Sequence, residues 1–273
     1  MTNQSSCDVV VVGAGMIGAA CALYAVRAGL DVVVVDRGPV AGGTTGAGEG
    51  NLLVSDKEPG PELELALLSC RLWRGITEDR RPDDHRPPTR GNGLGPGLTP
   101  GLGRAVEYEP KGGLVVASTP GALTALTELA VGQRAAGVET VAVDANQLRE
   151  LEPYLAPGLA GGVLYPQDAQ VMPTLAAAHL LRASGARVET GRTVTGVLRG
   201  PDGAVRGVRT DRGDLLAPSV VNAAGTWGAE VAAPRGRLAA GPAAPGIRRG
   251  HRAVAAPGTA QGVLRRLCGR RRQ

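Results

Sequence analysis

Short apolar runs and a glycine-rich break alternate along the N-terminal part of the chain. Val9–Val12 is a continuous β-branched run, which is typical of a parallel strand buried on both faces. An Ala-rich helix is predicted over Ala19–Ala28, and Gly29 is placed to end it. Val32–Val35 predicts a second buried strand. Together these runs predict a strand–helix–strand unit of about 30 residues.

The pattern continues with short elements through the middle of the chain. Pro61–Trp73 has helical apolar spacing, and Val106–Ser118 is interpreted as a turn between two strands. The remaining predicted elements are a helix with Pro120 near its start, a short strand and a helix capped near Asp144, a strand-like segment over Gly161–Pro173, a helix ending at Gly185, strands joined by turns at Asp202-Gly203 and Arg212-Gly213, and a buried strand at Val220–Asn222.

Two stretches show no such pattern. Residues Asp79–Arg104 are dense in Pro, Gly and charge, so we interpret them as a disordered insertion or a local sequence defect. Asp83, Asp84 and His85 within it invite a metal site, but a solvated loop is the favoured interpretation. From Val231 onward the chain has ten Arg and no acidic residue. We expect this tail to be largely disordered, because it has no periodic apolar face.

Composition limits the function further. The net charge of +5 comes from the tail, because the rest of the chain has 20 basic and 25 acidic residues. We therefore expect no binding of nucleic acid. The four cysteines form no C-x-x-C pair and the three histidines lie far apart, so no metal site is predicted. No apolar run of membrane-spanning length occurs, and a soluble, cytoplasmic protein is expected.

The break after the first strand is a G-x-G-x-x-G fingerprint. Gly13 permits the tight turn, Gly15 lets a pyrophosphate approach the backbone, and Gly18 lets the helix pack on the strand. The helix N-terminus, with Met16 and Ile17, presents free N–H groups to that pyrophosphate. Asp36, at the end of the second strand, can accept hydrogen bonds from a ribose diol.

These residues leave FAD and NAD(P) both open. Arg37 suits a 2′-phosphate, but Asp36 before it would repel that group. A second glycine-rich stretch, Gly42–Leu53, allows another close backbone approach to a long cofactor, and a flexible loop is the alternative interpretation.

The stretch DVVVVGAGMIGAACALYAVRAGLDVVVVDR, followed by GGTTGAGEGNLL, resembles the FAD-dependent D-amino acid oxidase (DAO) superfamily. YEPKGGL and GGVLYPQDAQV are most similar to its glycine/sarcosine oxidase and D-hydroxyproline dehydrogenase/opine oxidase subunit branch. The resemblance covers residues 7–78 and 105–230 and then stops, so the chain is expected to be C-terminally truncated or frameshifted.

The resemblance implies an α/β fold, with a Rossmann-like FAD-binding domain and an inserted, incomplete α+β substrate domain. The expected segments are 1–78 and 185–230 for the FAD-binding domain, 79–104 for the insertion, 105–184 for the partial substrate domain and 231–273 for the tail. The residues that the resemblance places at FAD, besides the fingerprint, Asp36 and Arg37, are Thr44 and Thr45 near the pyrophosphate, Gly50, Asn51 and Leu52 near the flavin, and Val194, Ala223, Ala224 and Gly225 on the return segment.

The implied activity is oxidation of the CH–NH bond of a small amino acid or amine by hydride transfer to flavin, with little or no activity expected of this chain. Partner subunits of a heteromeric dehydrogenase are a further implied possibility. An NAD(P)-linked dehydrogenase and a non-catalytic flavoprotein remnant are the alternatives. No catalytic residue is assigned. Tyr108, Tyr165 and Gln167 are possible substrate contacts, but structural packing is the favoured interpretation of each.

Overall fold

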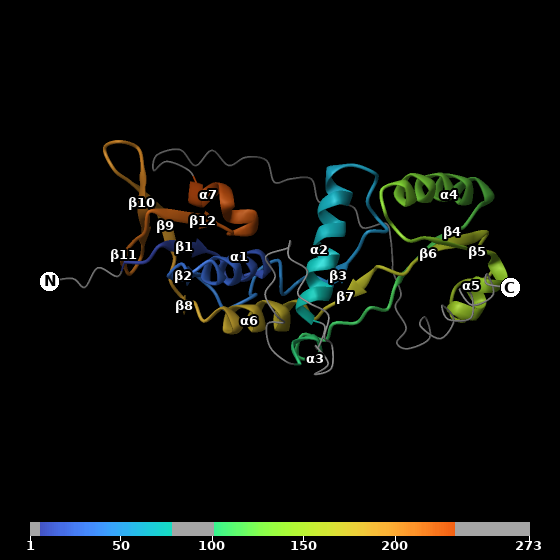
Figure 1. Cartoon of the computed structure of the whole chain (residues 1–273), viewed down its shortest axis with the longest axis horizontal. Coiled ribbons are helices and arrows are strands. Elements are labelled where there is room, and N and C mark those ends of the chain that lie inside the picture. The colour runs from blue at the N-terminus through green and yellow to red at the C-terminus, as the bar shows by residue number, and fades with distance from the viewer. Residues whose placement is uncertain (1–5, 78–100, 233–273) are drawn as a thin grey trace. The chain divides into compact units, whose positions relative to one another are not determined.

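The computed structural model of the chain describes residues 6–77 and 101–232, which form two compact units (Figure 1). Unit 1 contains the described residues up to Gly50 and from Met172 onward, and unit 2 contains those from Asn51 to Val171. Unit 2 is therefore an insertion within unit 1, as predicted. Most of the predicted insertion (79–104) and of the predicted tail (231–273) lies outside the described residues, and with them lie Asp83, Asp84 and His85.

A parallel sheet forms the centre of unit 1. Its strand order is β12-β1-β2-β8. The strands are β1 (Val9–Val12), β2 (Val32–Val35), β8 (Arg187–Glu189) and β12 (Ser219–Asn222). Every residue of β1 and β2 is buried, because a parallel strand covered on both faces has no solvent side. The predicted strands β1, β2 and β12 are confirmed. The expected burial of β12 is wrong, because Val220 and Val221 are only half-buried and Asn222 is exposed at this edge of the sheet.

One helix lies against this sheet, and a second helix packs on the first. α1 (Met16–Arg27) and α6 (Pro173–Ser184) contact one another, and Figure 1 shows them side by side. Their buried positions are mostly small, which allows close approach: Gly18, Ala19, Ala22, Ala176 and Ala177. α1 begins three residues before the predicted start, because its first turn belongs to the fingerprint itself. Gly185 ends α6 in the left-handed conformation, as predicted.

An antiparallel sheet completes unit 1. Its order is β11-β10-β9, built from β9 (Val194–Arg199), β10 (Val205–Thr210) and β11 (Gly213–Leu216). Val208 and Leu215 pack in one core cluster with Val10, so this sheet covers the parallel one. The described chain ends in the 3-10 turn η1 (Gly225–Trp227) and α7 (Gly228–Ala232).

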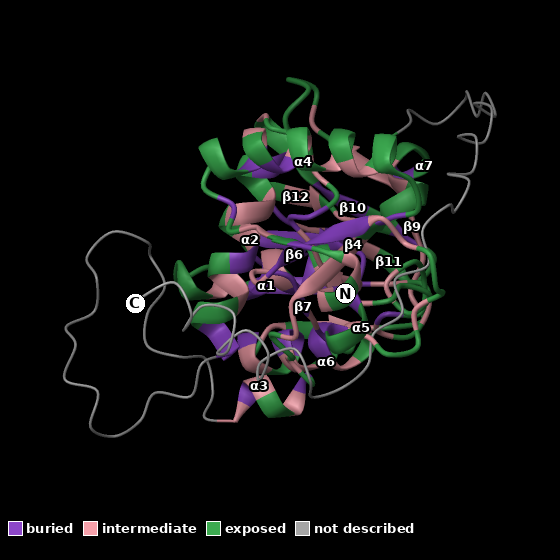
Figure 2. Ribbon diagram, turned by 90° about the vertical axis from the view of Figure 1, so that its right-hand side faces the viewer, coloured by how far each residue is buried: buried purple, intermediate pink, exposed green. Residues whose placement is uncertain are grey.

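Unit 2 is a small α+β unit. Its three-stranded antiparallel sheet has the order β4-β6-β5, from β4 (Gly113–Ala117), β5 (Val141–Val143) and β6 (Gly161–Tyr165). The central strand β6 is buried throughout and is purple in Figure 2. The other elements are β3 (Asn51–Leu52) paired with β7 (Ala169–Gln170), and α2 (Pro61–Thr77), α3 (Leu102–Ala105), α4 (Pro120–Ala135) and α5 (Ala145–Leu151). The predicted capping by Asp144 is confirmed as a capping box with Gln147.

Three sequence expectations differ from the structure. No strand precedes β4 in 106–112, where Glu109 forms a single bridge to Gln170, since Pro110 has no N–H to extend the ladder. The segment 161–173 is two strands separated by a turn rather than one. Residues 101–104 belong to α3 and its N-cap, with Leu102 buried, so the predicted insertion boundary at 104 is too late.

The unit boundaries also differ from the predicted domains. The first segment of unit 1 ends at Gly50 rather than at 78, because α2 packs its apolar positions in a core with Val138, Val163 and Tyr165 of unit 2. Helix α6, predicted as part of the substrate domain, belongs to unit 1 because it packs on α1.

Candidate functional site: the glycine-rich turn of unit 1

The fingerprint glycines lie where the backbones of three segments converge. Gly13 has φ +111°, and a side chain there would collide with the carbonyl oxygen of Ala223. A side chain at Gly18 would collide with the carbonyl oxygen of Gly13. In both cases the obstacle is backbone and cannot swing aside. Two of the three glycines are therefore required by the fold of the turn, in agreement with the roles predicted for them.

Gly15 faces a different neighbour. A Cβ atom there would lie 2.9 Å from Oγ1 of Thr45, in the second glycine-rich segment. The same Thr45 hydroxyl accepts a hydrogen bond of 3.0 Å from the N–H of Met16, the first residue of α1. Gly15 itself caps the helix without any side-chain bond. The second glycine-rich segment therefore meets the helix N-terminus, which is the end that attracts anions.

Asp36 is fixed beside this turn by backbone donors. Its Oδ2 accepts from the N–H of Ala14 at 2.7 Å, and its Oδ1 accepts from the N–H of Gly38 at 2.8 Å. Each carboxylate oxygen can accept more than one hydrogen bond, so the group can still bind a diol. The carboxylate is thus aimed and held before any ligand arrives.

Arg37 is stacked on a tryptophan that no sequence pattern singled out. Its guanidinium carbon lies 4.3 Å from the centre of the Trp227 ring. A Cβ at Gly43 would lie 3.4 Å from the same indole, so the ring also packs on the second glycine-rich segment. Trp227 follows Gly225 by two residues on the return segment. Only the folded chain brings it to Arg37.

The return segment closes against the first turn. The N–H of Ala223 donates to the carbonyl of Val12 at 2.8 Å, and the N–H of Ala224 donates to Oδ1 of Asn222 at 3.3 Å. Gly225 follows with φ +57°, a conformation that favours glycine. The predicted residues Gly13, Ala223 and Ala224 therefore lie together.

Five other predicted residues are more peripheral. Thr44 is exposed in the turn that precedes Gly50, and Gly50 has φ +78° at the end of the first segment of unit 1. Asn51 and Leu52 form β3, which belongs to unit 2. Val194 begins β9, is half-buried, and packs against the core cluster of the parallel sheet. The roles proposed for these five at a pyrophosphate, a flavin or an adenine stay predictions.

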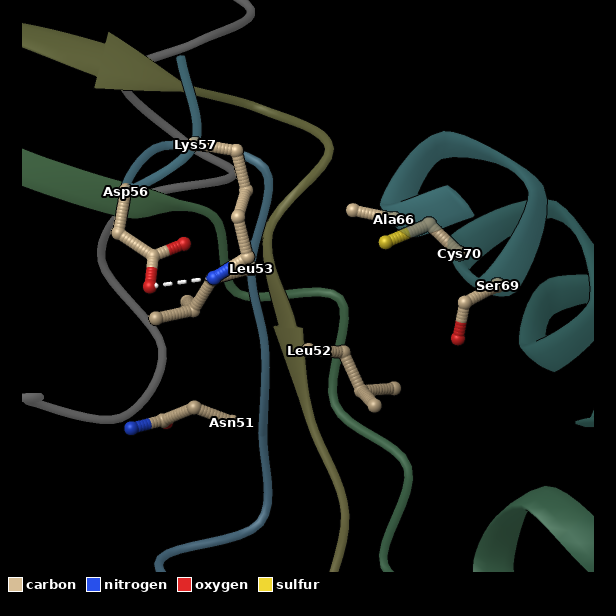
Figure 3. A pocket seen from close by; sticks show the side chains of 8 residues that line it. All are labelled: Asn51, Leu52, Leu53, Asp56, Lys57, Ala66, Ser69 and Cys70. Carbon is tan, nitrogen blue, oxygen red and sulfur yellow. Dashed lines mark hydrogen bonds and ion pairs between the residues drawn. The ribbon is translucent and has the colours of Figure 1, made fainter. Parts of the chain in front are cut away.

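Unit 2 contains a pocket of its own, with a volume of about 250 Å³ (Figure 3). Figure 3 shows two sides to it: the segment after Gly50 on one and helix α2 on the other. Its lining consists of Asn51, Leu52, Leu53, Asp56, Lys57, Ala66, Ser69 and Cys70. Burial alone would lower the pKa of Lys57, but ion pairs with Asp56 at 2.8 Å and Glu62 at 3.4 Å outweigh it and raise that pKa. The ammonium is therefore kept charged at the pocket.

Two of the possible substrate contacts have structural partners. Tyr165 is fully buried, and its hydroxyl donates to Oε1 of Gln133 at 2.8 Å. Burial first, and then the Asp168 carboxylate, raise the pKa of Tyr165 to about 12. Gln167 accepts from the N–H of Glu139 at 2.9 Å. Tyr108 follows α3, and its N–H donates to the carbonyl of Gly103. The packing interpretation fits Tyr165 and Gln167.

The described residues form neither a metal-binding cluster nor a membrane-spanning helix. Among residues 6–77 and 101–232 no group of three or more His, Cys, Asp or Glu could hold a metal ion. Within the same ranges, none of the helices combines the length and apolar character that crossing a bilayer requires. Cys7, Cys21 and Cys70 are free thiols.

Comparison with known proteins gives consistent relatives. Residues 8–267 match the family described as DAO, FAD dependent oxidoreductase, so the match continues past Glu230, where the resemblance found in the sequence ended. The anaerobic glycerol-3-phosphate dehydrogenase of Escherichia coli K12 has one subunit that is 32% identical over 84% of this chain and 39% of its own length. Mitochondrial sarcosine dehydrogenase from Mus musculus is 28% identical over 86% of this chain and 24% of that protein.

A solved structure shares the fold. Glycine oxidase from Geobacillus kaustophilus superposes with a TM-score of 0.69 and 25% identity, over 84% of this chain and 58% of that one. The chain thus spans less than two thirds of each of these three relatives.

Proposed function

Because the chain belongs to the DAO family of FAD-dependent oxidoreductases, we propose that unit 1 holds FAD and that the protein oxidises the CH–NH bond of a small amino acid or amine. The observation that carries the cofactor assignment is the match of residues 8–267 to a family of FAD-dependent oxidoreductases. The crowded backbone at Gly13, Gly18 and the Ala223 carbonyl supports a dinucleotide-binding turn at this position. The relatives named for glycine and for sarcosine support the substrate class.

The described residues fit the cofactor. In the proposal, the pyrophosphate lies at Gly13–Gly18, where the helix N-terminus and close backbone favour an anion. Asp36 binds the ribose diol, and its two backbone hydrogen bonds keep it aimed. FAD supplies the acceptor for the two electrons of the oxidation. This chain's own residues bind and orient the cofactor, and no residue is assigned as acid or base.

A second candidate is oxidation of a glycerol phosphate. It is supported by the relative of 32% identity, which is named for glycerol-3-phosphate. The same relative is named as a subunit, so we also propose that the protein works with partner subunits. An NADP-linked dehydrogenase is disfavoured, because the Asp36 carboxylate next to Arg37 would repel a 2′-phosphate and Arg37 is already stacked on Trp227. An NAD-linked dehydrogenase is disfavoured because the family that the chain matches is FAD-dependent. A cytoplasmic location is also proposed, and the free thiols Cys7, Cys21 and Cys70 support it, since reduced cysteines are the rule there.

The test is anaerobic reduction of the bound flavin. The full chain is loaded with FAD and mixed in turn with glycine, sarcosine, D-amino acids, opines, glycerol 3-phosphate and NADPH, while the flavin absorbance is followed. The proposal predicts that an amino acid or amine bleaches the flavin fastest. Fastest bleaching by glycerol 3-phosphate or NADPH would reject the substrate class. A bound flavin that none of them reduces would favour a non-catalytic remnant, and fast reduction would overturn the expected low activity.

A further inference from the structure

One segment of unit 2 is held by buried polar side chains to an unusual degree. Residues Val54–Lys57 follow β3 and carry Asp56 and Lys57 into the pocket lining. Val54 and Ser55 are buried, although they belong to no helix or strand. Buried backbone outside regular structure must find hydrogen-bond partners elsewhere, and here it finds them in side chains.

The carbonyl groups of this segment are bound by Gln133 of helix α4. Its Nε2 lies 2.7 Å from the carbonyl oxygen of Lys57, 3.3 Å from that of Ser55 and 3.4 Å from that of Val54. Gln133 is fully buried, and the Tyr165 hydroxyl bonds its other end at 2.8 Å. The Tyr165 bond fixes which way the amide faces, because its oxygen accepts from the phenol and its nitrogen must then face the carbonyls.

The N–H side of the same segment is bound by Asp168, which is 1% exposed. Its Oδ1 accepts from the N–H of Val54 at 2.8 Å, and the backbone and hydroxyl of Ser55 also bond the carboxylate. Its Oδ2 is buried and has no hydrogen-bond partner among the described residues. That oxygen lies against Gly113, where any side chain would collide with it. Burial of a carboxylate oxygen without a hydrogen bond lowers the free energy of unfolding. Its presence therefore indicates a role that a smaller residue would not fill.

We infer that Gln133, Tyr165 and Asp168 are positioning residues, which hold Val54–Lys57 as one wall of the unit 2 pocket and so set where Asp56 and Lys57 present their charges. The inference rests on the proposed function for its purpose, because this segment follows the residues predicted to approach the flavin. The geometry of the three residues does not depend on it. They come from α4, the end of β6 and the turn before β7, and all converge on one stretch of backbone.

Cys70 offers a local reporter for this wall. It lines the pocket and packs in the same core cluster as Val54. Cys7 in unit 1 is a matched internal control, because both thiols are 9% exposed and burial is the first cause that raises the pKa of each. Alkylation of both by iodoacetamide, measured peptide by peptide in the folded full chain, compares opening of the wall with opening of the other unit.

Gln133→Leu removes the three contacts of Nε2 with the carbonyls at nearly unchanged volume, and the backbone bond from the N–H of Lys57 to the carbonyl of Val54 stays. We expect Cys70 to be alkylated about tenfold faster or more, the factor that 1.4 kcal/mol corresponds to, and Cys7 to change by less than about twofold. Tyr165→Phe removes only the bond that orients the amide, so a smaller increase at Cys70 alone is expected. Asp168→Ala should accelerate Cys70, and Asp168→Asn, which keeps an acceptor for the Val54 N–H, should restore the slower rate.

Ser184→Ala is the control variant, because this buried hydroxyl bonds the carbonyl of Leu181 in unit 1 and does not touch the pocket. It should leave Cys70 unchanged. Equal acceleration of Cys7 and Cys70 in Tyr165→Phe and Asp168→Ala would mean general loosening and would overturn the inference, as would unchanged rates at both. If Gln133→Leu does not fold, these two variants still decide.

A functional readout separates a positioning role from a purely structural one. In chain loaded with FAD, Tyr165→Phe should keep the bound flavin but alter its absorbance band or its rate of reduction, and Asp168→Asn should lie nearer the wild type than Asp168→Ala. If the absorbance band and the rate of flavin reduction stay unchanged in all variants, the three residues have a structural role only. A wild-type chain that binds no FAD would reject the proposed function, while the alkylation rates would still test the wall.

Discussion

The candidate nucleotide site of unit 1 is made mostly of backbone, whereas the pocket wall of unit 2 is held by buried side chains. At Gly13 and Gly18 the absence of a side chain is what the fold requires. At Val54–Lys57 the opposite holds, since three large polar side chains from distant parts of the chain make the arrangement. The glycine-rich turn of unit 1 therefore tolerates little addition, and the pocket wall of unit 2 tolerates little removal.

This difference predicts a large effect for an added side chain in unit 1. Gly18→Val would place its Cβ against the carbonyl oxygen of Gly13, which is backbone in the turn between β1 and α1. We expect a loss of about 3 kcal/mol or more in the free energy of unfolding. Urea or thermal unfolding followed by circular dichroism measures it.

Gly196→Val is the matched control, because Gly196 lies in β9 and an added Cβ there meets nothing within 4 Å. Its stability should be equal to that of the wild type or slightly higher, since valine favours a strand. Equal destabilisation by both substitutions would contradict the account of a crowded turn.

Removal of the acidic side chain at the candidate site should weaken the binding of FAD. Asp36→Ala deletes the acceptor proposed for the ribose diol and the bonds to the N–H groups of Ala14 and Gly38. A hydrogen bond to a charged group is worth about 1.5–3 kcal/mol, so the dissociation constant for FAD should rise about 10- to 100-fold. Titration calorimetry measures it. Asp202→Ala, at an exposed hairpin ion pair, should leave the constant unchanged.

The buried carboxylate of unit 2 should make stability depend on pH. Burial raises the pKa of Asp168, and the bonds from Ser55 and Val54 oppose this only in part. The folded state therefore binds the proton more tightly than the unfolded state. The stability that the protonated Asp168 gives the folded state is full below pH 3.8 and is lost as the pH rises through the folded pKa. Asp168→Asn stays neutral, so its melting temperature should gain on the wild type over that range. A melting temperature of Asp168→Asn that falls relative to that of the wild type as the pH rises would contradict this sign.

The smallest expected effect concerns Trp227. Its contact with Arg37 is a cation–π pair at a partly exposed position, worth about 0.5–1 kcal/mol. Trp227→Leu should lower the stability of unit 1 by about that amount, whereas Trp227→Phe should keep most of it. Parallel thermal melts of the two variants check this. Identical melting temperatures for both would show that the cation–π pair does not contribute to stability.

The same contrast explains what the sequence could predict. The valine runs, the fingerprint and Asp36 are contiguous in the chain, so their spacing alone indicates a strand, a turn and a helix. Capping at Asp144 and the end of α6 at Gly185 follow from local chemistry in the same way. Local patterns are enough wherever the partners are neighbours in sequence.

The pairs that join distant segments could not be predicted in this way. Trp227 and Arg37, and Gln133 and Lys57, are brought together only by the fold. A buried glutamine has no sequence signature, and the residues next to position 133 in its helix are mostly exposed. The predicted domain boundaries differ from the observed units for a related reason. The unit to which α2 or α6 belongs depends on the core that each helix covers.

The most direct test of the central claim is the binding of FAD to a chain with a side chain at Gly15. Calorimetric titration of FAD and of NADP⁺ is carried out on the wild type, on Gly15→Val and on Gly121→Val, whose site in α4 is open and lies in unit 2. The account predicts that the wild type and Gly121→Val bind FAD far more tightly than NADP⁺, and that Gly15→Val binds neither while remaining folded. Full FAD affinity in Gly15→Val, or preference for NADP⁺ in the wild type, would contradict it.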